Sequence, residues 1–70
     1  MTIKDRKNRR AVVIETKVTD SESKLGSACE AALTQITERQ YATAIKKVGY
    51  TQVFSLGIAF YQKQCRVKMV

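Results

Sequence analysis

Two segments of the chain have the apolar, β-branched character of β-strands. The first, residues 11–18 (Ala-Val-Val-Ile-Glu-Thr-Lys-Val), is β-branched almost throughout and has apolar residues on both faces. The second, residues 53–60, is apolar at nearly every position. Apolar runs of this kind are typical of central strands that are covered on both sides. We therefore predict two central strands, each buried on both faces.

The period of two in a strand determines which side chains share a face. In the first strand, one face carries the even-numbered residues from Val12 to Val18, and the other carries Val13, Glu15 and Lys17. In the second strand, the even-numbered residues 54–60 form one apolar face. Two charged side chains are thus predicted on one face of a buried strand.

Between these strands, apolar residues recur at steps of three and four, which predicts an amphipathic helix packed on a sheet. The residues of this stripe are Leu25, Cys29, Ala32, Leu33, Ile36 and Gln40. Thr19 and Glu22 have the spacing of a capping box, so the helix is expected to start near them. A further helical turn or two is predicted over residues 41–48, and Gly49 suits a C-cap.

The remaining segments complete the predicted order of elements. Residues 4–10 are too polar for a core element and are expected to form a loop after a short strand remnant. Residues 61–64 are expected to turn, and residues 65–70 alternate in the manner of a half-exposed hairpin strand near a sheet edge. The order is strand, loop, strand, helix, strand, strand. Because strand–helix–strand crossovers are right-handed and parallel, we predict an α/β fold in which one helix layer covers a mixed sheet.

The charge balance is strongly positive, because thirteen Lys or Arg residues stand against six Asp or Glu and give a formal net charge of +7. Such a charge favours an anionic partner, with DNA as the first candidate. The residues expected to hold phosphates in the loop are Lys4, Arg6, Lys7, Arg9 and Arg10. The alternative for this loop is a solvated turn that keeps a sheet edge soluble.

Composition also excludes some functions. The chain has no His, which excludes His-based catalysis and leaves no usual ligand set for structural zinc. Cys29 and Cys65 are expected to be reduced and buried, with a disulfide as the open alternative. No apolar run approaches the roughly 20 residues that span a bilayer, and residues 1–10 contain no apolar signal segment. We therefore expect a cytoplasmic chain without a membrane partner.

The tripeptide Glu15-Thr16-Lys17 is the main candidate for chemistry, since ionised groups on a buried strand need a partner or a metal. One interpretation is a local Glu–Lys pair where the strand nears solvent. The other is a metal-dependent phosphodiesterase site. In that site the Glu15 carboxylate and the Thr16 carbonyl would bind Mg²⁺, and Lys17 would orient or deprotonate the attacking water.

Several segments together resemble the PD-(D/E)xK nuclease superfamily. They are residues 11–18, Ala-Leu-Thr-Gln-Ile at 32–36, Tyr41, Gly49-Tyr50, residues 57–60 and Cys65-Arg66-Val67. The likeness is greatest to a nuclease-like domain found behind AAA-ATPase-like modules in bacterial proteins. It implies a site with Glu15, Lys17 and Gln35, Mg²⁺ or Mn²⁺ as the cofactor, and Tyr41 near the DNA. The alternatives are a surface amide for Gln35 and a packing aromatic for Tyr41.

The chain also departs from the family pattern. The first motif Asp would lie just before or at Met1, the family's opening helix is missing, and Asp5 sits in the basic turn as a poor substitute. One carboxylate holds Mg²⁺ weakly. We therefore expect residues 1–70 to form one incomplete nuclease-like domain, a truncated product or C-terminal fragment that is inactive alone.

Two other functions stay open beside the nuclease. One is a non-catalytic basic module that binds nucleic acid. The other is an assembly element whose uncovered sheet is covered by a partner chain or by a second copy of this chain.

Overall fold

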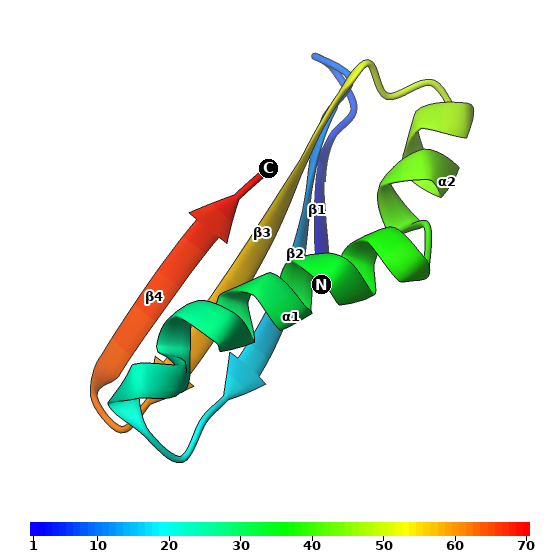
Figure 1. The fold of residues 1–70 in the computed structure, drawn as a ribbon. Coiled ribbons are helices and arrows are strands. Elements are labelled where there is room, and N and C mark those ends of the chain that lie inside the picture. Colours follow the sequence, from blue (N-terminus) through cyan, green and yellow to red (C-terminus); the bar gives the residue numbers. More distant parts are fainter.

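Four strands form one mixed sheet in the order β1-β2-β3-β4 (Figure 1). In the computed structural model, which describes residues 1–70, the strands are β1 (Thr2–Asp5), β2 (Arg10–Val18), β3 (Gln52–Tyr61) and β4 (Gln64–Met69). The central strands β2 and β3 are parallel, and both outer strands are antiparallel to their neighbours. The predicted α/β class, with one helix layer on a mixed sheet, is confirmed.

The connection from β2 to β3 contains all of the helical structure. A short 3₁₀ turn, η1 (Glu22–Lys24), leads into α1 (Leu25–Glu38), and α2 (Tyr41–Lys47) follows. Leu25, Cys29, Ala32, Leu33 and Ile36 are the buried residues of α1, which confirms the predicted stripe as far as Ile36.

Two details of the predicted helix are wrong. Gln40 is exposed and adopts a left-handed backbone with φ 56°, which ends the helical path between α1 and α2. The Thr19–Glu22 capping box does not form, because the Thr19 hydroxyl donates to the carbonyl of Ser21 instead. The predicted second helix is confirmed; its C-cap residue is Val48, and Gly49 follows with φ 104°, the positive φ that suits the glycine after a helix end.

A glycine lets α1 lie close to the sheet. A Cβ on Gly57 of β3 would come within 2.5 Å of the carbonyl oxygen of Cys29.

Cys29 itself is buried, and its thiol donates to the carbonyl of Arg66 on β4. Both cysteines are free; Cys65 is exposed, so its predicted burial is wrong. No helix combines the length and the apolar character that crossing a membrane requires.

The predicted loop at residues 4–10 is shorter in the structure. Lys4 and Asp5 belong to β1 and Arg10 belongs to β2, so only residues 6–9 turn. The register runs from Thr2↔Val13 to Asp5↔Arg10. Backbone pairing at a sheet edge needs no apolar side chains. The polar side chains of residues 4, 5 and 10 therefore wrongly indicated a loop where the backbone forms strands.

Only one face of the sheet is covered, so the prediction that both central strands are buried on both faces is wrong. Both helices lie on the same side in Figure 1, and the opposite side carries no second layer. Val18 on this side is 83% exposed, and Phe54 and Phe60 are each 40% exposed. Apolar residues on both faces show what a strand can bury, whereas a single right-handed crossover supplies a cover for one face only.

Candidate functional site

The side chains of Glu15 and Lys17 lie on the helix-covered face of β2. The register pairs Glu15 with Gly57 and Lys17 with Ala59, and both charged residues are half-buried. The ion pairs of the chain are Arg10–Asp5, Lys24–Asp20 and Lys68–Glu30. Glu15 and Lys17 therefore do not form the local ion pair that was one interpretation of the tripeptide.

Glu15 instead lies within electrostatic range of Arg39, just after α1. The Arg39 guanidinium donates a hydrogen bond to the Tyr41 hydroxyl at 3.2 Å. This hydrogen bond is the main reason that the pKa of Arg39 is raised, attraction to Tyr41 adds to it, and Glu15 contributes a smaller attraction. Arg39 thus bonds to Tyr41 and feels the charge of Glu15 without an ion pair to it. Sequence reasoning missed Arg39, although its spacing of four residues from Gln35 was an available signal.

Gln35 is not a solvated surface amide. It is half-buried on α1, and its Oε1 atom is buried without a hydrogen-bond donor. A buried acceptor without a donor costs about 1–3 kcal/mol. Gln35 and Arg39 are one helical turn apart and share a side of the helical path.

The predicted oxygen ligands do not build a metal site by themselves. Glu15 offers one carboxylate and Gln35 one neutral oxygen. The predicted backbone ligand is the carbonyl of Thr16. Met1 exchanges hydrogen bonds with Ile14, two residues earlier, so β1 does not reach Thr16 and brings no further side chain to it. No group of three His, Cys, Asp or Glu side chains gathers anywhere in the chain. Because Mg²⁺ needs several converging oxygens, these residues do not fit a preformed Mg²⁺ site.

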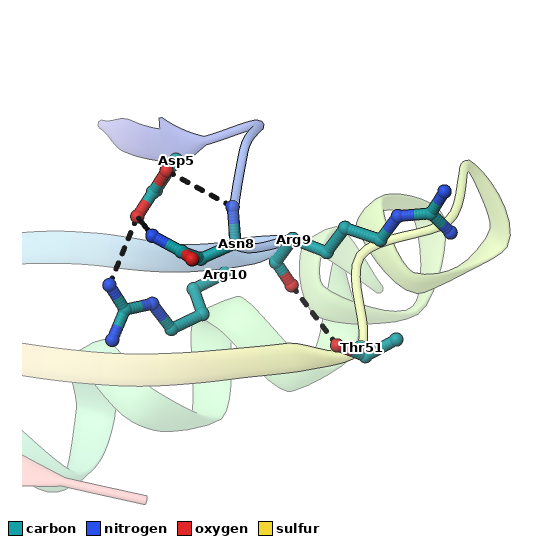
Figure 2. A network of polar contacts seen from close by, with 5 residues as sticks. All are labelled: Asp5, Asn8, Arg9, Arg10 and Thr51. Atoms are coloured by element: carbon teal, nitrogen blue, oxygen red, sulfur yellow. Dashed lines mark hydrogen bonds and ion pairs between the residues drawn. The ribbon is translucent and has the colours of Figure 1, made fainter.

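Asp5 does not supply the second carboxylate. It pairs with Arg10, five residues before Glu15, which is about 16 Å along β2. Its carboxylate accepts hydrogen bonds from the Asn8 side chain at 2.9 Å, the Asn8 N–H at 3.3 Å and Arg10 Nη2 at 3.0 Å (Figure 2). These contacts, the Asn8 side chain first, lower the pKa of Asp5.

This network orders the basic turn, defined here as residues 6–9. Asp5 neutralises Arg10, so Arg6, Lys7 and Arg9 are the cations of the turn without an acidic partner. The Arg9 backbone is left-handed, with φ 55°. Its side chain extends away from Asp5, on the side where the chain leads from α2 into β3 (Figure 2).

A concave surface of about 350 Å³ lies between the basic turn and the end of α2. We call it the basic cleft; its lining residues are Arg6, Arg9, Val48, Gly49 and Tyr50. Tyr50 is half-buried against the main core cluster, which holds its ring in place. Lys4 Nζ lies 5.7 Å from the centroid of that ring, within the range of a cation–π contact. Exposed Lys46 and Lys47 in the last turn of α2 add positive charge beside the cleft.

The structure therefore brings only some of the predicted nucleic-acid residues together. Lys4, Arg6 and Arg9 gather at the basic cleft, and Tyr50 is the aromatic residue that joins them. Tyr41 begins α2, whereas the cleft follows the end of α2, about 10 Å away along the helix axis. Gly49-Tyr50 after a helix was the available signal for the aromatic residue, but only the fold brings it beside residues 4–9.

One comparison with known proteins gives a match. A family model described as the PD-(D/E)XK nuclease superfamily matches residues 1–70. The match includes the strand with Glu15 and Lys17 and both helices, and it supports the superfamily without confirming the particular likeness to domains beside AAA-ATPase-like modules. No curated protein and no solved structure matches the chain.

Proposed function

Because the chain belongs to the PD-(D/E)XK nuclease superfamily, we propose that it is a nuclease-like domain that binds nucleic acid through the basic cleft and does not cleave it alone. The observation that carries this proposal is the joining of Arg6, Arg9 and Tyr50 in one concave surface. The Glu15 carboxylate, in contrast, belongs to no group of three His, Cys, Asp or Glu side chains that could hold a metal ion.

The chemistry of the basic cleft suits a polynucleotide. Arg and Lys side chains bind phosphate oxygens without reading sequence, and an aromatic ring offers a surface on which a base can stack. Arg6 and Arg9 supply the cations, and Tyr50 supplies the ring. We expect DNA to be the preferred partner and binding to be independent of sequence.

The proposed lack of cleavage follows from the donor set. Nucleases of this superfamily generally use Mg²⁺ or Mn²⁺. Glu15 is a single carboxylate, and the positive charges of Lys17 and Arg39 on the same side of the sheet oppose a divalent cation. Calorimetric titration with Mn²⁺ is therefore expected to show no binding below about 1 mM.

Phosphodiester cleavage with Glu15, Lys17 and Gln35 is the second candidate function. The buried Oε1 of Gln35 favours it, because this acceptor has no partner within the fold. Cleavage of plasmid DNA with Mn²⁺ that is lost in Glu15→Gln would support this candidate and contradict the proposed lack of activity.

Binding is tested by fluorescence anisotropy with labelled double-stranded DNA, single-stranded DNA and RNA. With about four phosphate contacts, affinity should fall about 100-fold between 50 and 200 mM salt. Arg6→Gln should weaken DNA binding about 5-fold, whereas Lys63→Gln, which removes the same charge from the β3–β4 turn, should change it less than about 2-fold. Equal effects of the two variants would contradict binding at the cleft.

A further inference from the structure

The uncovered side of the sheet has the composition of a buried surface. We call it the open face; the apolar or uncharged residues that the register assigns to it are Met1, Ile3, Val12, Ile14, Thr16, Val18, Gln52, Phe54, Leu56, Ile58, Phe60, Cys65, Val67 and Met69. The charged side chains on this face are Asp5 and Arg10, which pair with each other at its end beside the basic turn. Monomeric proteins rarely expose an apolar patch that crosses a whole sheet.

In β4 the charged residues lie on the helix-covered side and the apolar residues lie on the open face, the reverse of what a solvated sheet face requires. Arg66 and Lys68 lie on the helix side, where Lys68 forms an ion pair with Glu30 of α1. Val67 and Met69 lie on the open face, where they are largely exposed. A sheet with one solvated face places its polar residues on that face, so the alternation in β4 indicates that the open face is covered in solution.

We infer that a second copy of this chain covers the open face, so that two sheets pack face to face in a symmetric dimer. The molecule extends 39 × 22 × 15 Å, so the outline of its broad side, which contains the open face, is on the order of 800 Å². A standard protein interface buries about 800 Å² on each partner. A dimer that uses this side approaches the size of such an interface, and two such sheets would stack about 10 Å apart.

Repulsion between the basic turns favours an antiparallel arrangement of the two copies. The basic turn precedes β2, whereas the charges at the other end of β2 cancel, because Asp20 pairs with Lys24 and Lys63 offsets Glu22. Antiparallel packing about a two-fold axis brings the basic turn of one copy toward this neutral end of the other. The two basic turns then lie at opposite ends of the dimer, beyond the Debye length of about 8 Å at physiological salt. This arrangement leaves both basic clefts on the outside and does not depend on the proposed function.

The test is the mass of the chain in solution by sedimentation equilibrium, from about 5 to about 200 μM. The expected mass is that of two chains of 7.9 kDa each. Val67→Lys puts a charge into the open face and should raise the dissociation constant at least about 100-fold. Gln64→Lys adds the same charge to the helix side of β4 and should leave the mass unchanged.

A thiol measurement covers the case in which Val67→Lys fails to fold. Cys65 lies on the open face, whereas Cys29 is buried in the core, so maleimide should label the wild-type chain first at Cys65. Labelling of Cys65 should slow at least about 10-fold as the chain dimerises. A monomer at every concentration with constant labelling would overturn the inference and indicate a different partner. A dimer that a folded Val67→Lys variant retains would also overturn it.

Discussion

The carbonyl oxygen of Arg9 accepts a hydrogen bond from the N–H of Thr51 at 2.9 Å. The Gln52 N–H at 3.2 Å and the Thr51 hydroxyl at 3.4 Å donate to the same oxygen. These bonds join the basic turn to the segment just after Tyr50, although the two are more than forty residues apart in the chain. The cations and the aromatic ring of the basic cleft are therefore held as one unit.

Arg9→Gly separates the charge of Arg9 from its backbone role. The left-handed backbone of Arg9 costs about 1–2 kcal/mol for a residue with a Cβ, and glycine adopts it freely. We expect the free energy of unfolding, measured with urea, to stay constant or to rise by about 1 kcal/mol. DNA affinity, measured by anisotropy at 50 mM salt, should fall about 5-fold.

Gln62→Gly is the matched control, since Gln62 in the β3–β4 turn has φ 52° and is uncharged. It should stabilise the chain in the same way and leave DNA affinity unchanged. If Arg9→Gly retains full affinity while it remains folded, Arg9 does not contact nucleic acid.

The pH dependence of stability tests the network around Asp5. The hydrogen bonds of Asn8 and Arg10 lower the pKa of Asp5 in the folded chain below its ordinary value of 3.8. The network therefore contributes its full stability above that value, and the contribution is lost as the pH falls through the lower folded pKa. Urea unfolding should show wild type more stable than Asp5→Asn at pH 7, with the difference shrinking as the pH falls below 3.8. A difference that is independent of pH would contradict this assignment.

Two glycine substitutions on the helix side should have opposite effects on stability. Gly57→Ala would place a methyl group 2.5 Å from the Cys29 carbonyl oxygen and should lower the free energy of unfolding by about 1–3 kcal/mol. Gly26→Ala lies in α1 and meets only the far end of the long Arg66 side chain, at 3.3 Å, so it should raise stability by up to about 1 kcal/mol. Thermal unfolding measures both; a tolerated Gly57→Ala would show that α1 does not pack this closely on β3.

Gln35→Met tests the unpaired amide. Methionine has nearly the same length and removes the buried acceptor, so the free energy of unfolding should rise by about 1 kcal/mol. A loss of stability of similar size would show that Gln35 Oε1 has a hydrogen-bond partner in solution.

The local pattern of the sequence predicted much of the fold. The stripe from Leu25 to Ile36 and the alternation in β2 correctly identified the helix, the parallel strands and the faces of the sheet. The errors arise where local pattern and tertiary context differ. Gln40 continues the helical period, yet its left-handed backbone turns the chain into α2. One face of the sheet is uncovered because the fold has a single helix layer, and the number of helix layers cannot be derived from the sequence of any one strand.

The candidate site was predicted less completely, because it depends on contacts between distant segments. The basic character of residues 4–10 was evident in the sequence, but the pairing of Arg10 with Asp5 separates it from the free cations of the turn. Tyr50 approaches Lys4 only because the Arg9–Thr51 hydrogen bonds bring the two segments together. Arg39 feels the charge of Glu15 because α1 crosses the sheet and carries Arg39 toward β2. The residue spacing alone does not specify this path.

The most direct test of the central claim is an NMR titration of the ¹⁵N-labelled chain with a short DNA duplex in the presence of Mg²⁺. We predict that the amide shifts change most at residues 6–10 and 49–52, around the basic cleft, and that the DNA stays intact. Shifts that concentrate at Glu15–Lys17 and Gln35, or an absence of shifts, would contradict binding at the basic cleft. Cleaved DNA in the same sample would contradict the claim that the domain does not cleave alone.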